Sequence, residues 1–366
     1  MTAATAPPLE QALADLTREG ELYRRLADGR IQCDACGHRC RLGEGEAGIC
    51  RVRFHTGGRL QVPAGYVGHM LTSPVEQQPF LHALPGATVF GFSMLGCNYH
   101  CGYCHNWTLS QTLRDPDAGE GPRRMMPQEL VRLARRAGAS IIASKYNEPL
   151  ITAEWAAEIF AIARAQGLLT AFTSNGHATP EALAYLRPVV DLYKVDLKAF
   201  REESYRSLGG SLRIVLRSIE QLMELGFWVE VVTLCVPGFN DSDQELKEMA
   251  AWLASLSRDL PWHVIAFHQD YRMRDRPDTP DATLMRAVAI GRAAGLRYVY
   301  AGNRPALEPT YQNTSCPGCG AVLVERSGFR CIQSHLVDGS CPGCATPIPG
   351  IWPTASGPLQ RNLLAH

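Results

Sequence analysis

From residue 87 onward, apolar runs of strand length alternate with amphipathic stretches that have the period of helices. Strands that alternate with helices are typical of βαβ units, whose crossovers make the strands parallel. The alternation therefore predicts an α/β fold with a parallel sheet over residues 86–305. The predicted strands are 87–94, 140–144, 168–174, 192–197, 228–236 and 263–267, and the predicted helices are 127–137, 154–165, 180–186, 212–225 and 243–256, followed by a helix over 280–294 and a strand over 298–301.

Two architectures can be built from these units. Six strands with five intervening helices fit a partial (β/α)6 barrel, and a doubly wound sheet is the competing arrangement. Polar residues recur directly after the predicted strands, where α/β barrels place their active sites. This recurrence favours the barrel.

The thirteen cysteines fall almost entirely into three groups. The chain has no apolar run of the ~20 residues that a membrane span needs, and no apolar core near its start that would indicate a secretory signal, so we expect a cytoplasmic protein. In a reducing compartment, clustered cysteines bind metal more often than they form disulfides. Lys plus Arg equals Asp plus Glu, 36 against 36, so no charge excess favours nucleic acid as a partner. The groups are Cys33, Cys36, Cys40 and Cys50; Cys97, Cys101 and Cys104; and Cys316, Cys319, Cys341 and Cys344.

The middle group has only three thiols, at C-x3-C-x2-C spacing, directly after the first predicted strand of the sheet. Closed zinc and iron–sulfur sites normally take four protein ligands. Three cysteines leave one iron of a cubane cluster open to an exogenous ligand, which makes Cys97, Cys101 and Cys104 a candidate reaction centre. The alternative is a structural zinc site that His100, His105 or a distant residue completes.

Each flanking group has four thiols and can close its own site. In residues 310–355, two Cys-Pro-Gly-Cys knuckles predict a zinc-ribbon-like module; a second iron–sulfur cluster is the alternative, and Cys331 is a substitute ligand. In residues 31–85, the C-x2-C-x3-C-x9-C set fits Zn²⁺, which we favour, or an auxiliary iron–sulfur cluster, with His38 as a substitute ligand. Leucines at near-helical spacing predict a leading helix over residues 1–30.

The cysteine triplet, with Tyr103 before its last cysteine, resembles the motif of the radical S-adenosylmethionine (radical SAM) superfamily. Over about residues 20–352 the chain resembles the radical SAM enzyme of the AmmeMemoRadiSam system, a group related to the activating enzymes of glycyl radical enzymes. Two positions depart from that group: Gln77-Gln78 replace expected lysines, and His105 replaces glutamine, so that His105-Asn106 looks like the activating enzymes. The motifs that carry the resemblance are Cys33…Cys50 with Gly48, Pro74–Phe80, Pro85-Gly86, Gly96–Trp107, Tyr146–Pro149, Ser174–Gly176, Val195–Lys198, Val236–Asp241, Tyr300–Asn303 and Cys316…Cys344.

The resemblance implies a [4Fe–4S] cluster on the three cysteines, with S-adenosylmethionine on its open iron. An electron donor such as flavodoxin or ferredoxin would drive reductive cleavage to a 5′-deoxyadenosyl radical, which abstracts hydrogen from a substrate that the sequence does not identify. That substrate is either a small molecule, handled with the two proteins for which the AmmeMemoRadiSam system is named, or a partner protein, as for glycyl radical activases. A non-catalytic zinc-binding interaction protein is the remaining alternative.

The resemblance also implies which residues hold the cofactor, and each has a simpler interpretation. Glu148, with Asn147, is expected at the amino group, although Glu148-Pro149 is also a helix-start signal. Lys198, with Asp196 on the same strand face, is expected near the carboxylate, although the two also fit a buried salt bridge. The other expected contacts are Tyr103, Asn106, Ser174, Asn175 and His268, with Val236–Asp241 under the adenine; Ser174–Gly176 and Val236–Asp241 otherwise fit ordinary turns, and His268 an ordinary polar residue at a strand end.

Overall fold

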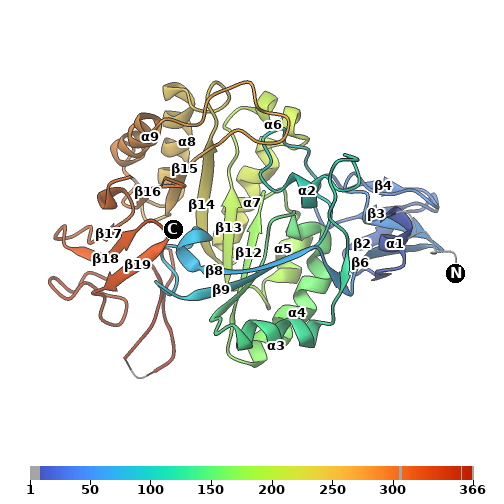
Figure 1. Cartoon of the computed structure of the whole chain (residues 1–366), viewed down its shortest axis with the longest axis horizontal. Helices are drawn as coiled ribbons and strands as arrows, with labels where there is room; N and C mark the ends of the chain where they lie inside the picture. The colour runs from blue at the N-terminus through green and yellow to red at the C-terminus, as the bar shows by residue number, and fades with distance from the viewer. Residues whose placement is uncertain (1–8, 305–306, 356, 365–366) are drawn as a thin grey trace, which may run out of the picture.

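The computed structural model describes residues 9–304, 307–355 and 357–364, and its centre is one eight-stranded sheet (Figure 1). Seven strands are parallel and lie in chain order, and β8 is added antiparallel at one edge. The strand order never reverses, as it would at the switch point of a doubly wound sheet. The doubly wound alternative is therefore wrong. The strands are β8 (His69–Pro74), β9 (Thr88–Ser93), β11 (Ile141–Ser144), β12 (Leu169–Ser174), β13 (Leu192–Asp196), β14 (Trp228–Cys235), β15 (Trp262–Ala266) and β16 (Val299–Gly302).

Helices connect the parallel strands and pack on one face of the sheet, as α4 on β12, α7 on β14 and α9 on β15 show. Both faces are buried, which explains why the strand sequences are nearly continuous apolar runs. The predicted elements agree with the observed bounds to within one or two residues, while α2 and α6 lay outside the prediction. The helices are α2 (Trp107–Ser110), α3 (Pro127–Arg136), the 3₁₀ turn η2 (Pro149–Thr152), α4 (Ala153–Ala165), α5 (Pro180–Leu186), α6 (Glu202–Leu208), α7 (Leu212–Glu224), α8 (Asp243–Leu256) and α9 (Asp281–Ala293).

The other face of the sheet is filled by the segment between β8 and β9, which includes the 3₁₀ turn η1 (Val75–Gln77). Phe80 and Leu84 from this segment pack with Leu192 and Trp228 of the sheet in one apolar cluster, and Ile351 from near the end of the chain joins them. This cluster covers the N-terminal ends of the strands on the sheet face opposite the helices, which we call the inner face. At the C-terminal ends of the strands, the inner face is lined by polar residues.

A C-terminal module of short strands packs against this closed end. Arg326 donates a hydrogen bond of 2.6 Å to the carbonyl of Leu81, and a nitrogen of His82 lies 2.6 Å from the carbonyl of Pro349. The backbone of Ile351 also exchanges hydrogen bonds with the segment at His82 and Leu84. The module contains η3 (Pro309–Tyr311), β17 (Thr314–Ser315), β18 (Val322–Ser327), β19 (Arg330–Ser334), β20 (Gly350–Trp352) and β21 (Gln360–Asn362).

The N-terminal module differs from the prediction at its start. Of the expected leading helix over residues 1–30, residues 1–8 lie outside the described chain, and the helix α1 covers only Leu9–Ala14. Thr17–Glu19 instead pairs with residues 61–63, and the buried Leu16 and Leu22 lie in the bends on either side of this strand. The remaining strands are β1 (Thr17–Glu19), β2 (Tyr23–Arg25), β3 (Ile31–Cys33), β4 (Arg41–Leu42), β5 (Phe54–Thr56), β6 (Arg59–Pro63), β7 (Tyr66–Val67) and β10 (Arg123–Arg124).

A buried ion pair ties the N-terminal module to the sheet domain. Both guanidinium NH groups of Arg53 donate to the Glu154 carboxylate of α4 at 2.7 Å. The backbone N–H groups of Glu21 and Leu22 donate to the same carboxylate. Burial opposes the charge of Glu154, but Arg53 outweighs it and lowers the pKa of Glu154 below its usual range.

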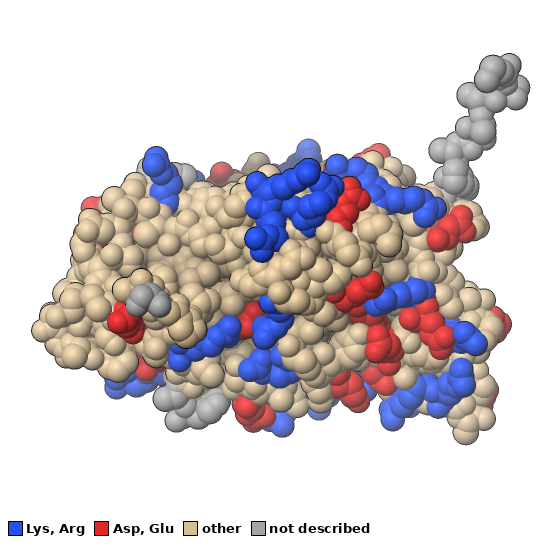
Figure 2. Space-filling view, turned by 90° about the horizontal axis from the view of Figure 1, so that it is seen from below, with Lys and Arg blue, Asp and Glu red and all other residues tan. Residues whose placement is uncertain are grey.

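The surface carries both signs of charge. On the face in Figure 2, Asp and Glu lie among the Lys and Arg side chains, without a large region of one sign. This distribution matches the zero net charge of the sequence. None of the helices in the described parts of the chain combines the length and apolar character that crossing a bilayer requires.

Candidate active site

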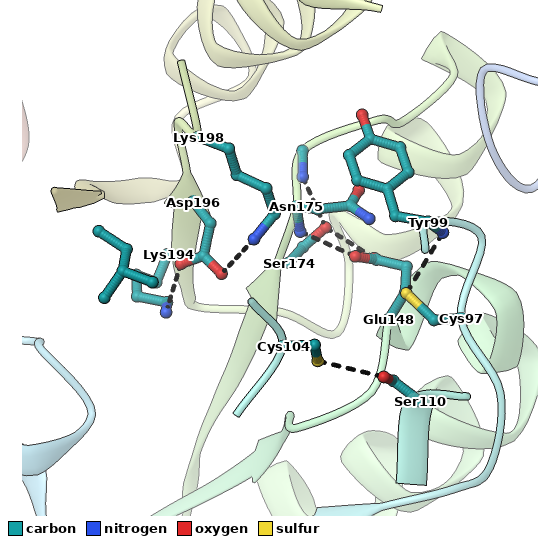
Figure 3. Close-up of polar contacts among 12 residues, drawn as sticks. Cys97, Tyr99, Cys104, Ser110, Glu148, Ser174, Asn175, Lys194, Asp196 and Lys198 are labelled. Atoms are coloured by element: carbon teal, nitrogen blue, oxygen red, sulfur yellow. Dashed lines mark hydrogen bonds and ion pairs between the residues drawn. The ribbon is translucent and has the colours of Figure 1, made fainter. Parts of the chain in front are cut away.

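A cavity of about 340 Å³ opens at the C-terminal ends of the parallel strands. The cysteine triplet lines it, together with residues that follow β11, β12 and β13 (Figure 3). In parallel α/β folds the strands end at the same edge, so loops far apart in sequence meet there. The predicted residues that line the cavity are Cys97, Cys101, Tyr103, Cys104, Asn106, Asn147, Glu148, Asn175, Asp196 and Lys198.

The three cysteines lie on the loop between β9 and α2. Cys97 accepts a hydrogen bond from the backbone N–H of Tyr99 at 3.4 Å, and the Cys104 sulfur lies 3.2 Å from the Ser110 hydroxyl. Burial raises the pKa of all three thiols, that of Cys101 to about 12. A metal that binds these thiols must displace their protons, and three thiols on one loop are donors that both iron and zinc accept.

The C-terminal cysteines are gathered more closely than the triplet. A tetrahedral Zn²⁺ with bonds of about 2.3 Å holds its sulfurs about 3.8 Å apart. Cys316, Cys319, Cys341 and Cys344 meet this demand, with two sulfur pairs 3.5 and 3.6 Å apart. Within residues 9–304, 307–355 and 357–364, no other group of three or more Cys, His, Asp or Glu has all its ligand atoms within 4.8 Å of one another. The sulfurs of the triplet are thus not all within 4.8 Å of one another.

The N-terminal cysteines adjoin the triplet. The Arg114 guanidinium donates to the carbonyls of Ile49, Cys97 and Tyr99, at 2.5, 2.9 and 2.9 Å, and so joins the loop before Cys50 to the triplet loop. The four sulfurs of Cys33, Cys36, Cys40 and Cys50 also fall outside the compact spacing of the C-terminal set.

Glu148 is held by three protein donors at the end of β11. Its carboxylate accepts hydrogen bonds from the Ser174 hydroxyl at 2.7 Å and from the backbone N–H groups of Asn175 and Leu150 at 2.7 and 3.0 Å. Burial raises the pKa of Glu148 to about 7, against the effect of these donors. A carboxylate has about four acceptor positions, so one position is left for a ligand ammonium. The helix-start interpretation is also correct, since Glu148 caps η2.

Asp196 lies between two lysines on β13 and directly after it. Its carboxylate accepts from Lys194 at 2.6 Å and from Lys198 at 3.4 Å (Figure 3). Burial opposes the charges of Asp196 and Lys198, but the ammonium groups of Lys194 and Lys198 outweigh it and lower the pKa of Asp196, while the Asp196 carboxylate raises the pKa of Lys198 well above its usual range. The predicted salt bridge is present but only partly buried, and the long contact leaves other Lys198 donors free to reach into the cavity.

Some predicted residues do not line the cavity. Ser174 lies behind Glu148 and positions it. His268 is exposed and stacks on His105, with ring centroids 3.7 Å apart, and only His105 lines the cavity. From the fifth predicted strand, Val232 and Leu234 face the cavity, whereas the following turn is folded on itself by the Asn240 side chain, which accepts from the backbone N–H of Val236.

Several lining residues were not predicted. Lys194 has the same strand parity as Asp196 and Lys198, so period-two alternation could have identified it. Lys145 directly precedes the predicted Tyr146-Asn147-Glu148, but alternation gave no reason to point four consecutive residues inward. All four line the cavity because Tyr146 has a φ of 75°, in the left-handed region, which breaks the alternation.

The comparisons with known proteins agree with this site. The family model of the radical SAM superfamily matches residues 92–253. An uncharacterized protein of Methanocaldococcus jannaschii is 36% identical over 336 residues, which cover 90% of this chain and 98% of that protein. The pyruvate formate-lyase-activating enzyme of Staphylococcus aureus is 23% identical over 195 residues, 50% of this chain and 76% of that enzyme.

Among solved structures, the crystal structure of Streptococcus suis SuiB bound to S-adenosylmethionine has a TM-score of 0.45 and 14% sequence identity, and it covers 64% of this chain and 55% of that chain. The matched region of the family model contains the triplet, Glu148, Asp196 and Lys198. From the sequence matches to the superfamily and to the activating enzyme, we conclude that the chain belongs to the radical SAM superfamily.

Proposed function

We propose that the protein binds a [4Fe–4S] cluster through Cys97, Cys101 and Cys104 and cleaves S-adenosylmethionine reductively, so that hydrogen is abstracted from a substrate. The cluster would supply the electron for this cleavage, and the 5′-deoxyadenosyl radical would be the abstracting species. The observation that carries the proposal is that three unpaired, widely spaced thiols share one cavity with an acceptor for an ammonium, Glu148, and a donor for a carboxylate, Lys198.

The chain's own residues would orient the cofactor and restrict water. Glu148 and the amide of Asn147 would accept the ammonium, and Lys198 would donate to the carboxylate. Tyr103 and Asn106 line the cavity beside the triplet, Asn175 lines it beside Glu148, and Ser174 holds Glu148 in place. Val232 and Leu234 offer apolar contact for the adenine. His268 would act only through its stacking on His105.

For the wider role, we propose an enzyme of the AmmeMemoRadiSam type on an incomplete barrel, with flavodoxin or ferredoxin as reductant. This type has two partner proteins and a small-molecule substrate. The Staphylococcus aureus activating enzyme and the His105-Asn106 pair support the alternative, a glycyl radical activase with a protein substrate. Incubation with deuterated candidate substrates, followed by mass spectrometry of 5′-deoxyadenosine, distinguishes the two through the substrate that donates deuterium.

The direct test is anaerobic purification and reconstitution with iron and sulfide. We expect a brown protein that forms 5′-deoxyadenosine from S-adenosylmethionine when dithionite is added. A colourless protein that holds zinc at all three cysteine groups and forms no 5′-deoxyadenosine would contradict the proposal and favour the interaction protein.

Glu148→Gln is expected to weaken S-adenosylmethionine binding by about 10–100-fold, because a charge-assisted hydrogen bond of about 1.5–3 kcal/mol is lost. In the native protein the ionised carboxylate is the binding form, and its pKa is about 7. Affinity should therefore fall about tenfold per pH unit below 7. Calorimetric titrations between pH 5.5 and 8.5 measure both effects. A Gln variant with the same pH slope as the native protein would show that another group titrates.

For the C-terminal module we propose a structural Zn²⁺ at Cys316, Cys319, Cys341 and Cys344. A Cys319→Ser/Cys341→Ser variant is expected to lose about one zinc per chain while its iron content stays unchanged. Elemental analysis of both metals measures this. Loss of iron in equal proportion would instead indicate a second cluster in the module.

A further inference from the structure

The chain uses lysine very sparingly. Of its 36 basic Lys and Arg residues only four are lysines, and three of them, Lys145, Lys194 and Lys198, line the same cavity. The fourth, Lys247, is exposed on α8. The positive charge on the surface in Figure 2 is therefore almost entirely arginine. Lysine carries a compact charge on a flexible stem, whereas arginine presents a planar fork. The cavity is thus lined by compact ammonium groups and the surface by guanidinium groups.

Lys145 lacks the partner that the other two cavity lysines have. Lys194 and Lys198 both contact the Asp196 carboxylate, whereas among the described residues no carboxylate lies within 4.0 Å of the Lys145 ammonium nitrogen. Its polar partner is the neutral amide oxygen of Gln78, and its nitrogen lies 4.0 Å from the centroid of the Tyr146 ring. Lys145 is only 5% exposed.

The amide of Gln78 is held in place from behind. Its nitrogen donates to the Ser73 hydroxyl, which fixes the amide oxygen toward Lys145. Gln77 and Pro79 line the cavity beside it. Gln78 is one of the two glutamines that replace expected lysines. Lys145, directly after β11, contacts it.

This arrangement gives the cavity an excess of positive charge. Three lysines line it with two carboxylates: Asp196 is already contacted by Lys194 and Lys198, and Glu148 is occupied by three protein donors. A buried ammonium without an anion is unstable. Burial, with the nearby charge of Lys194, accordingly keeps the pKa of Lys145 well below its usual range. An anionic group in this part of the cavity would restore the balance and stabilise the ammonium.

We propose that Lys145 and Lys194, with the amide of Gln78, bind an anionic group of the substrate, a carboxylate or a phosphate. This inference rests on the proposed function, because it assigns the cofactor to the side of Glu148 and Lys198. Figure 3 shows Lys194 on the side of Asp196 away from Glu148 and Cys97. The substrate anion would thus lie beyond Asp196, beside Lys145 after β11 and Lys194 of β13.

The small number of lysines makes the test specific. Protein grown with ¹³Cε-lysine gives only four lysine signals, which single Lys→Met variants assign. The holoenzyme with oxidised cluster and S-adenosylmethionine is titrated with inorganic phosphate in one arm and succinate in the other. We expect saturable binding of one anion, with shifts of the Lys145 and Lys194 signals and none of the Lys247 signal. The arm that responds identifies the anion class.

Calorimetry on variants gives the second readout. Lys145→Met is expected to weaken binding of the responding anion by about 10-fold or more, since a hydrogen bond to a charged group is lost, while Lys247→Met, the matched control, should bind it as the native protein does. The proposal is overturned if neither anion shifts the Lys145 signal, or if Lys145→Met and Lys247→Met bind equally. Should Lys145→Met fail to fold, the native titration still decides.

The two proposals can fail separately. Formation of 5′-deoxyadenosine by the native protein, measured without either anion, tests the radical SAM activity alone. Native protein that forms this product but shows no anion response would retain the proposed function and lose only the anion subsite. Native protein without product would lose the proposed function, whatever the anions do.

Discussion

Cys101→Ala is expected to abolish 5′-deoxyadenosine formation and to remove the iron of the central site, about four atoms per chain. Cys101 is buried in the middle of a three-ligand set, and two remaining thiols cannot hold a cubane cluster with one open iron. The C-terminal four-cysteine group has its own compact geometry, so its metal should remain bound. Iron and zinc analysis, the visible absorption spectrum and product detection by mass spectrometry measure these outcomes together.

Cys331→Ala is the matched control, because Cys331 is half-buried and belongs to none of the three groups. It should keep both metals and full product formation. If Cys101→Ala retained its iron and its activity, the reaction centre would have to be assigned to another cysteine group. If Cys331→Ala lost the C-terminal metal, Cys331 would be a ligand there after all.

Arg53→Met should lower the free energy of unfolding by about 3–5 kcal/mol, because it leaves the Glu154 carboxylate buried without its cation. The side chains of the pair are 2% and 0% exposed, so water cannot replace the lost partner. The double variant Arg53→Met/Glu154→Gln should recover part of the loss, since the charge is removed while an acceptor remains for Glu21 and Leu22. Denaturant unfolding of the metal-loaded protein measures both.

The exposed pair Arg18–Glu158 offers the comparison on the same helix. Its two side chains are 37% and 39% exposed, so Arg18→Met should cost under about 1 kcal/mol. Equal costs for Arg53→Met and Arg18→Met would mean that the buried pair does not anchor the N-terminal module.

The sheet was predictable because its strands are buried on both faces and its helices are amphipathic, two signals that survive in a single sequence. The start of the chain was not, because the leucines before residue 30 have helical spacing, but only Leu9 and Leu13 lie in a helix, while Leu16, Leu22 and Leu26 lie in the bends and loops beside short strands. Spacing alone does not decide between these when tertiary pairing, here β1 with β6, determines the outcome.

At the site, too, some residues have a signal in the sequence and others are placed by tertiary contacts alone. Glu148, Asp196 and Lys198 could be placed because they follow strands whose ends converge. The pairing of Lys145 with Gln78 joins residues 67 positions apart through a 3₁₀ turn and a left-handed tyrosine, neither of which has a local signal. His268 follows a strand too, but its side chain turns outward onto His105, which residue type and position do not reveal.

The contacts that Arg326, Pro349 and Ile351 make with the segment from Leu81 to Leu84 bear on how the protein matures. The eight-stranded sheet is complete in sequence at Gly302, and these contacts come from residues synthesised after it. Until they dock, the segment that closes the inner face lacks its support, and the Lys145–Gln78 contact built on that segment is not fixed. A chain that lacks residues 307–364 would therefore hold the cysteine triplet but not a finished chamber.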